Sequence, residues 1–200
     1  MNSNVIQSIN YDQKQIIKDI IKLHCPNGIE LDPTYSKGTF YKGKNINQPF
    51  YKFDLYPQTE DTLQANANNL PHANNTINSI MFDPPFIVGL GKKDKGIIAQ
   101  RFGVFKDIKS LWHWYSECLN EFYRILKPNG ILIVKCQDTI NSGKQYFSHV
   151  YLMNEAQKIG FYNKDLFVLL AKNRLIGANH KVQYHARKFH SYFIVLKKAK

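Results

Sequence analysis

The stretch SIMFDPPF (residues 79–86) decides the fold that we expect, because it joins a buried strand to an abrupt strand end. Residues 79–82 are mostly apolar, and Pro84 and Pro85 cannot donate hydrogen bonds to a neighbouring strand. The strand therefore ends at Phe82 and leaves the carboxylate of Asp83 at its carboxyl end. In an open α/β sheet, ligands bind at this end of the strands.

Strand and helix patterns alternate on both sides of this stretch. Strands are predicted over 28–32, 51–56, 79–82, 131–136, 165–171 and 191–198. Helices are predicted over 11–24, 62–70, 107–127 and 144–159. This alternation predicts an α/β fold, a mostly parallel sheet with helices on both faces. The last two strands follow each other without a helix, so we expect them to form an antiparallel hairpin at one edge of the sheet.

Length and composition indicate one domain over residues 1–200. A chain of 200 residues with 44% apolar side chains can bury a sizeable core. No stretch has the length of a membrane span or the pattern of a leader peptide, so we expect a cytoplasmic protein. The formal net charge of +12 favours a polyanionic partner such as nucleic acid. A basic surface without a specific partner is the alternative.

The basic residues gather in two stretches of the chain. One covers 91–110, and the other runs from Lys172 to the end, where no acid follows Asp165. Aromatic residues lie among these basic ones, a combination that can hold phosphates and stack on unpaired bases. The candidate nucleic-acid contacts are Lys92, Lys93, Arg101, Lys135, Arg187 and Lys188.

Cysteine and histidine spacing gives no sign of a metal site or of a disulfide framework. The three cysteines form no CxxC pair, and we interpret Cys118 and Cys136 as core residues. His180, His185 and His190 recur every five residues, which fits neither one helix face nor the HExxH motif. Phosphate contacts or packing are the favoured roles for these histidines.

Two further acids lie at predicted strand ends. Asp32 ends the strand in IELDPTYSKGTFYKG (residues 29–43) and is followed by a turn that contains Ser36 and Gly38. Such a turn lets the backbone approach a nucleotide-like cofactor closely, and Asp54 ends the next strand, where an acid can bond ribose hydroxyls. A GxGxxG fingerprint is absent, which argues against a dehydrogenase. Ordinary turn positions are the alternative role for both acids.

The order acid, proline, proline, aromatic suits the activation of an amino group. The exocyclic amino group of adenine is a poor nucleophile, because its lone pair is delocalised into the ring. The carboxylate of Asp83 and the carbonyl of Pro84 could accept its two N–H groups and expose the lone pair to a methyl donor. Phe86 offers a face on which the base can stack. Orientation and electrostatics would then supply most of the catalysis.

Three motifs together resemble the class I S-adenosylmethionine-dependent amino-methyltransferases of nucleic acids. In that family [D/N/S]PP[Y/F/W] is the catalytic motif, and DPP[Y/F] commonly accompanies adenine-N6 methylation. DPTYSKGTFY (residues 32–41) is similar to the family's cofactor loop DPFxGSGTT and agrees with it at Asp32, Pro33, Gly38 and Thr39, whereas Ser36 replaces the first glycine and Lys37 is bulkier than usual. YRILKPNGILIVKC (residues 123–136) is similar to RVLKPGGxLxxK, and ARKFHSYFIVLKK (residues 186–198) resembles the final hairpin strand.

The resemblance implies a Rossmann-like class I methyltransferase fold and S-adenosyl-L-methionine as the cofactor. It further implies adenine-N6 methylation, with DNA preferred over RNA, in the cytoplasm of a bacterial or phage-infected cell. The implied catalytic residues are Asp83, Pro84, Pro85 and Phe86. The implied cofactor-binding residues are Asp32, Pro33, Thr34, Tyr35, Ser36, Gly38 and Asp54.

Several alternatives stay open at this point. Cytosine-C5 methylation is disfavoured, because it needs a cysteine where Asp83 stands. We expect no separate target-recognition domain, so recognition falls on 87–110, expected to be a mobile substrate loop, and on 172–188. An ordinary surface loop is the competing interpretation of 87–110. The competing functions are methylation of ribosomal RNA or of another amino group, and a non-catalytic nucleic-acid-binding module.

Overall fold

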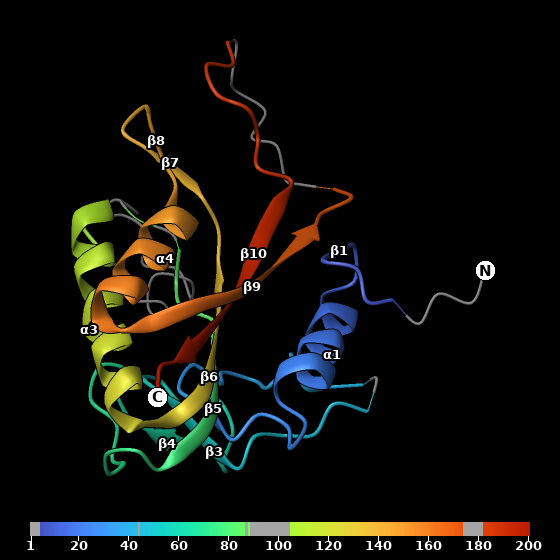
Figure 1. Ribbon diagram of the computed structural model, residues 1–200. Helices are drawn as coiled ribbons and strands as arrows, with labels where there is room; N and C mark the ends of the chain where they lie inside the picture. Colours follow the sequence, from blue (N-terminus) through green and yellow to red (C-terminus); the bar gives the residue numbers. More distant parts are fainter. Residues whose placement is uncertain (1–4, 44, 87, 89–104, 174–181) are drawn as a thin grey trace.

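A single mixed sheet forms the centre of the molecule (Figure 1). The computed structural model describes residues 5–43, 45–86, 88, 105–173 and 182–200. The strands of the main sheet are β1 (Ile9–Asn10), β2 (Leu31–Asp32), β3 (Tyr51–Asp54), β4 (Leu63–Gln64), β5 (Ile77–Phe82), β6 (Leu126–Cys136), β9 (Phe161–Leu170) and β10 (His190–Lys198). The helices are α1 (Gln13–His24), α3 (Ile108–Ile125) and α4 (Ser148–Ile159).

The strand order in this sheet is β1-β9-β10-β6-β5-β2-β3-β4. Strand β10 runs antiparallel to both of its neighbours, and every other neighbouring pair is parallel. The carboxyl ends of β2, β3, β5 and β6 therefore lie along one edge of the sheet. This arrangement confirms the predicted fold class, with an antiparallel β9–β10 pair beside which the two-residue β1 runs.

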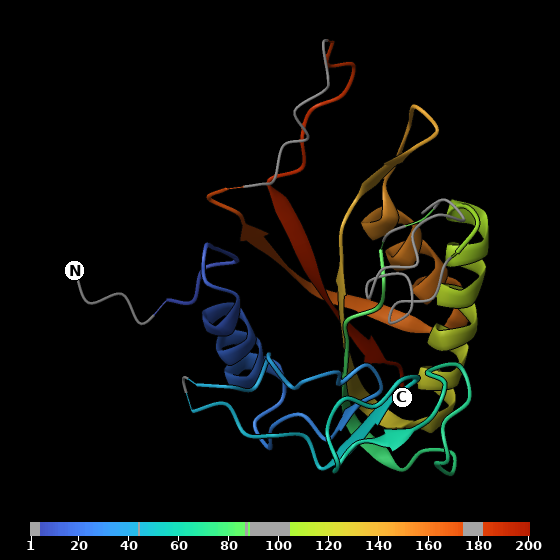
Figure 2. The same cartoon turned by 180° about the vertical axis from the view of Figure 1, so that it is seen from behind.

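Two apolar clusters cover the two faces of the sheet (Figures 1 and 2). The first packs α3 and α4 against one face, and the second packs α1 and the segment 35–46 against the other. Neighbouring residues of one strand point to opposite faces, so Phe82 joins the first cluster and Met81 joins the second. The strands are thus buried on both sides, as a mostly parallel sheet requires.

The helices start where the sequence supplies caps. The side chain of Asp12 accepts hydrogen bonds from two backbone N–H groups in the first turn of α1. Asp107 and Ser110 form a reciprocal capping box at the start of α3. The helices predicted over 11–24 and 107–127 are confirmed, with both bounds within two residues. No helix in the described ranges is long and apolar enough to cross a membrane.

The helix predicted over 62–70 is wrong. This segment contains β4 and turns, and Asn66 pairs with Asn69 across one of them. The backbone N–H of Leu70 donates to the buried carboxylate of Glu121 at 2.7 Å, and Arg124 donates to the carbonyl of His72 at 2.8 Å. The side chains of Glu121 and Arg124 in α3 therefore hold the backbone of this segment in an irregular path. A prediction from residues 62–70 alone does not include these two side chains.

The helix predicted over 144–159 begins four residues later, at Ser148. The residues before it form a separate hairpin of β7 (Thr139–Asn141) and β8 (Lys144–Tyr146). Ser142 and Gly143 connect these strands with φ angles of 49° and 73°. A two-residue hairpin loop of type I′ needs positive φ at both positions, and this pair meets the requirement without an Asn-Gly signature.

Candidate active site

The strand ends bring Asp32, Asp54 and Asp83 into one connected site. The backbone N–H of Thr34 donates to Asp32 Oδ1 at 2.8 Å, and the backbone N–H of Asp83 donates to Thr34 Oγ1 at 2.9 Å. The backbone N–H of Ser36 donates to Asp54 Oδ2 at 2.8 Å. The turn after β2 therefore links the ends of β2, β3 and β5 through hydrogen bonds.

Asp32 anchors this turn from inside the protein. Its side chain is buried, and Tyr41 donates its hydroxyl hydrogen to Asp32 Oδ2 at 2.7 Å. Burial raises the pKa of Asp32 to about 7, although the hydrogen bonds from Tyr41 and Thr34 act in the opposite direction. Both carboxylate oxygens are thus occupied by protein donors, which suits an anchor of the turn.

The turn itself needs residues that tolerate left-handed backbone. Ser36 has a φ of 53° and Gly38 a φ of 63°. A Cβ atom added at Gly38 would lie 2.3 Å from the hydroxyl oxygen of the buried Tyr35, so only glycine fits there. Ser36 occupies the position of the first glycine in the family's cofactor loop DPFxGSGTT. Its positive φ explains why glycine suits that position.

Two adjoining cavities open beside the turn. The first, here called the Asp54 cavity, has a volume of about 270 Å³. Its lining residues are Pro33, Thr34, Ser36, Asp54, Leu55, Asn66, Ala67, Asp83, Pro85, Phe105 and Trp114. The second, the Lys37 cavity, has a volume of about 260 Å³. Its lining residues are Asp32, Thr34, Tyr35, Ser36, Lys37, Thr39, Phe40 and Asp83.

These two cavities fit a nucleoside that carries a charged amino-acid tail. In the Asp54 cavity a carboxylate stands beside apolar walls such as Leu55 and Trp114, as a ribose and a base require. In the Lys37 cavity an ammonium and the Thr39 hydroxyl lie next to the Gly38 turn, as a carboxylate tail requires. The two cavities share Thr34, Ser36 and Asp83, so one elongated ligand can occupy both.

Asp83 forms an ion pair with Lys135 at the far side of these cavities. Lys135 Nζ lies 3.5 Å from Asp83 Oδ1, and the side chains are 15% and 29% exposed, respectively. The ammonium also lies 4.9 Å from the centre of the Phe40 ring and 5.9 Å from that of Phe193. Burial raises the pKa of Asp83, and Lys135 offsets part of this effect.

Two hydrogen bonds fix the Asp-Pro-Pro segment itself. Thr34 accepts from the backbone N–H of Asp83, and the buried Tyr115 of α3 donates its hydroxyl hydrogen to the Pro85 carbonyl at 2.6 Å. Within the described residues no group donates to the Pro84 carbonyl. The carboxylate of Asp83 and the carbonyl of Pro84 are therefore two acceptors on a fixed backbone.

A third cavity of about 320 Å³, the Phe86 cavity, lies on the other side of Lys135. Its lining residues are Tyr11, Gln13, Phe86, Lys135, Gln137, Leu169, Leu170, Ala171, His190 and Ser191. Asp83 lines the first two cavities and Lys135 lines the third, so their ion pair forms a shared wall. Phe86 thus lines a different cavity from the one that Asp54 lines.

The structure places some of the predicted nucleic-acid contacts and leaves others undescribed. Lys92, Lys93 and Arg101 lie outside the described residues, as does most of 87–110, of which Val88 pairs with Phe105. Lys135 lies within the site, at the shared wall. Arg187 is exposed and Lys188 half-buried, both in the connection between β9 and β10.

Sequence reasoning missed several residues of the site. Asn66 and Trp114 line the Asp54 cavity, and the Trp114 ring nitrogen donates to Asn66 Oδ1 at 3.4 Å. Tyr41 and Tyr115 hold the turn and the Asp-Pro-Pro segment. Trp114 lies in an amphipathic helix, where periodicity predicts packing and gives no signal of a site.

Residues 77–200 match the model of the N6_N4_Mtase family, described as DNA methylase, and the chain belongs to this family. S-adenosyl-L-methionine is the cofactor of this class of enzymes. The chain is also 33% identical over 88 residues to the type II methyltransferase M.HpaI of Haemophilus parainfluenzae. That match covers 44% of this chain and only 24% of the relative.

Solved structures share the fold at low sequence identity. TrmN from Thermus thermophilus superposes with a TM-score of 0.53 and 18% identity, over 92% of this chain and 48% of its own. The cyclase SpnF superposes with a TM-score of 0.54 and 12% identity, over 93% of this chain and 81% of its own. At 18% and 12% identity, the likeness describes the fold alone.

Proposed function

We propose that this site transfers a methyl group from S-adenosyl-L-methionine to the N6 amino group of adenine in DNA. The observation that carries the proposal is the place of Asp83, which ends β5 at the wall between the two cavities beside Asp54 and the Phe86 cavity. The cofactor would occupy the Asp54 and Lys37 cavities, and the target base would enter the Phe86 cavity.

The chain supplies hydrogen-bond acceptors in the pattern that amino-group methylation needs. S-adenosyl-L-methionine supplies an electrophilic methyl group when it is bound. Asp83 and the Pro84 carbonyl would accept the two N–H groups of the adenine amino group and direct its lone pair toward that methyl group. Because the hydrogen bonds of Thr34 and Tyr115 already fix these acceptors, little reorganisation accompanies the reaction.

Lys135 would keep the Asp83 carboxyl group ionised although the site is largely closed to water. Its ammonium is the charged group that opposes the effect of burial on the pKa of Asp83. An ionised carboxylate is a stronger acceptor than a protonated one, so this charge serves the proposed step.

The Phe86 cavity has the composition of a pocket for an extruded base. Phe86 and Tyr11 offer aromatic faces, and Gln137, His190 and Ser191 offer polar groups that can read a base edge. Such a base has to leave the duplex, because its amino group is otherwise paired.

Adenine is favoured over cytosine because the sequence Asp-Pro-Pro-Phe resembles the motif that accompanies adenine methylation. DNA is favoured over RNA because the chain belongs to a DNA methylase family. Both choices can be tested in one measurement.

The test is mass spectrometry of nucleosides after incubation with S-adenosyl-L-methionine and either unmethylated duplex DNA or total RNA. We expect N6-methyladenine in the DNA alone. N4-methylcytosine in the DNA, or methylated bases only in the RNA, would contradict the proposed substrate. No methylated base in either pool would contradict methyl transfer to nucleic acid.

Two variants test the role of Asp83 in this assay. Asp83→Ala should lower the rate by about 10²-fold or more, because it removes the charged acceptor, while calorimetry should find cofactor binding nearly intact. Asp19→Ala, which removes a carboxylate from α1, is the matched control and should keep full activity. Equal loss of cofactor binding and of rate in Asp83→Ala would refute the assigned role.

A further inference from the structure

Two projections stand above the edge of the sheet that carries the proposed site (Figures 1 and 2). The hairpin arm consists of residues 139–146, which contain β7 and β8. The loop arm consists of residues 182–189, directly before β10. The hairpin arm follows β6 and the loop arm precedes β10, and the Phe86 cavity includes Gln137 beside the first arm and His190 beside the second.

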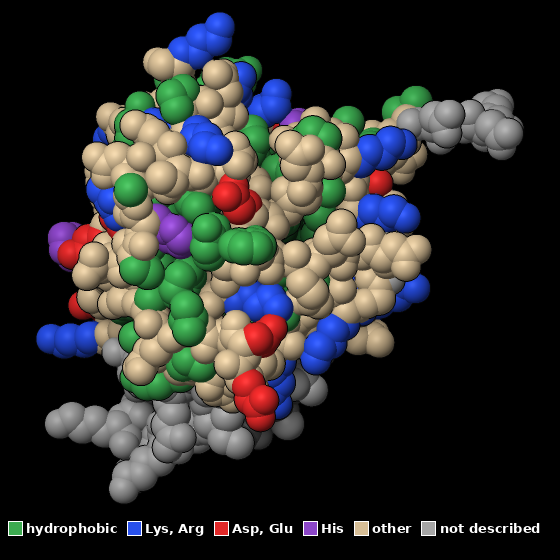
Figure 3. Space-filling model, turned by 90° about the horizontal axis from the view of Figure 1, so that it is seen from below, with side chains coloured by type: hydrophobic (Ala, Val, Ile, Leu, Met, Phe, Trp, Pro, Cys, Tyr) green, Lys and Arg blue, Asp and Glu red, His purple; other side chains and the backbone are tan. Residues whose placement is uncertain are grey.

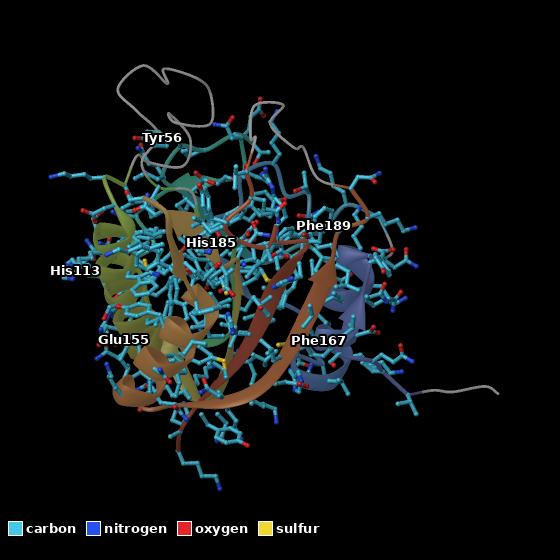
Figure 4. All side chains as sticks on the ribbon, turned by 90° about the horizontal axis from the view of Figure 1, so that it is seen from above. Tyr56, His113, Glu155, Phe167, His185 and Phe189 are labelled. Carbon is cyan, nitrogen blue, oxygen red and sulfur yellow. The ribbon has the colours of Figure 1, made fainter. Side chains whose placement is uncertain are left out.

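A hydrogen bond links the two arms. The ring Nε2 of His185 in the loop arm lies 2.8 Å from the carbonyl oxygen of Gly143 in the hairpin arm. Between the arms is a cavity of about 470 Å³. Its lining residues are Ile140, Gly143, Val182, Gln183, Tyr184, His185 and Arg187. In Figure 4, seen from above, His185 and Phe189 of the loop arm lie between α3 and α1.

A polar cluster joins the arms at their base. Asp138, buried at the start of the hairpin arm, lies 2.7 Å from the ring Nδ1 of His149, just after the hairpin's second strand. The His149 ring stacks on Tyr192 of β10 at 4.2 Å between ring centres, and the Tyr192 hydroxyl lies 2.9 Å from His190 Nε2. Asp138 precedes the hairpin arm, His149 belongs to α4, and His190 follows the loop arm, so the cluster links the bases of the two arms.

The exposed side chains of this surface include basic and aromatic residues beside aliphatic ones such as Ile140 and Val182. Lys144 in the hairpin arm and Arg187 in the loop arm are exposed, and no Asp or Glu occurs in 139–146 or in 182–200. The ring of Tyr184 is 85% exposed and so is open to contact with a ligand. By contrast, the face seen from below carries scattered Lys and Arg with acids among them (Figure 3).

We infer that the hairpin arm and the loop arm together form a surface that binds the DNA backbone next to the target base. Lys144 and Arg187 would contact phosphates from two sides, and the Tyr184 ring would cover a sugar or a base face. This inference rests on the proposed function for the identity of the polyanion. It adds a contact element, the β7–β8 hairpin, for which the sequence pattern gave no signal.

The experiment measures binding of a short duplex of random sequence by fluorescence anisotropy at a series of salt concentrations. Each lost phosphate contact should lower the slope of log affinity against log salt by about 0.9. We expect this decrease for Lys144→Ala and for Arg187→Ala, and about twice as much for the double variant. Lys22→Ala, which removes an exposed charge from the last turn of α1, is the matched control and should keep the wild-type slope.

The outcomes separate the two arms and the two proposals. A changed slope in Arg187→Ala with none in Lys144→Ala would overturn the two-armed surface, as would an equal change in Lys22→Ala.

The same samples are assayed for methylated bases. Methyl transfer by the wild-type protein with unchanged slopes in the variants defeats this inference alone. The expected slopes without methyl transfer support the surface and defeat the proposed function. Circular dichroism checks that each variant is folded.

Discussion

Asp83 and Lys135 show how two residues far apart in sequence become one functional unit. Residues 82 and 134 are register partners in the parallel β5–β6 pair, so the next residue on each strand lies side by side on the same face. Burial alone would favour the neutral carboxyl group, and the neighbouring ammonium opposes this. The ionisation of Asp83 thus depends on Lys135.

This dependence predicts a shift in the pH profile of methyl transfer. The rate should fall as the pH drops through the pKa of Asp83, because the protonated carboxyl group is the weaker acceptor. Lys135→Met removes the charge that lowers this pKa, so the acid limb of kcat/KM should move to higher pH. Lys135→Arg keeps the charge and should retain most of the wild-type profile.

The comparison with the wild-type protein isolates the effect of Lys135. Asp32, whose pKa burial raises to about 7, is a second buried carboxyl group of the site, and it is common to all three proteins. An acid limb at the same pH in Lys135→Met and in the wild-type protein would show that Lys135 does not act through Asp83.

At the scale of elements, the turn after β2 combines a backbone requirement with a packing requirement. Gly38 and Gly28 both have positive φ, at 63° and 86°. A Cβ atom at Gly38 would collide with Tyr35, whereas a Cβ atom at Gly28 would meet nothing within 4 Å. The two glycines therefore differ only in their surroundings.

The difference between Gly38 and Gly28 predicts that alanine at the two positions has similar effects on stability but different effects on cofactor binding. Gly38→Ala and Gly28→Ala should each cost about 1–2 kcal/mol of unfolding free energy from the left-handed backbone. Gly38→Ala should in addition displace Tyr35 and weaken binding of S-adenosylhomocysteine about tenfold or more, equivalent to about 1.4 kcal/mol. Titration calorimetry of both variants measures their affinity for S-adenosylhomocysteine. Equal affinities would mean that the turn does not form the cofactor site.

The elements differ in how well the sequence predicts them, and the reason is physical. Strands β5, β6 and β10 are apolar on both faces, and α1 and α3 carry clear caps and an apolar stripe, so local pattern was sufficient. The two-residue β4 and the segment after it depend on Glu121 and Arg124, which lie some fifty residues away. No local window contains that information.

On the scale of the whole molecule, the two apolar clusters share one sheet, and we propose that residues 1–200 fold as a single domain. Alternate residues of β5 and β6 belong to opposite clusters. If the helices on one face detached, the buried side chains of β5 and β6 on that face would therefore become exposed to water. Each cluster contains buried cysteine: Cys25 in the α1 layer, and Cys118 and Cys136 in the other layer.

These cysteines allow a test of the single domain. In a urea series, a pulse of a thiol reagent followed by peptide mass spectrometry reports the exposure of each cysteine separately. We expect all three to become reactive at the same urea concentration, since unfolding of one domain is cooperative. Labelling of Cys25 at clearly lower urea would show that the α1 layer unfolds as a unit of its own.

The site as a whole was predictable where topology alone decides position. A mostly parallel sheet places Asp32, Asp54 and Asp83 at one edge whatever the details of the loops. The pairing of Asp83 with Lys135 requires the register of β5 and β6, and the contacts of Tyr115 and Trp114 require the placement of α3. Sequence periodicity predicts which face of a helix is buried. It does not predict which strand ends that helix packs against.

The shared wall of Asp83 and Lys135 also bears on how the product would leave. Methyl transfer across this wall would carry one positive charge from the donor side to the nitrogen of the base. Lys135 lines the receiving cavity, and its ammonium would repel that charge, which favours prompt transfer of the extra proton from the nitrogen to the Asp83 carboxylate and from there to water. The methylated base would then be uncharged, with no ionic attraction to Asp83, and its return to the duplex would meet little electrostatic resistance.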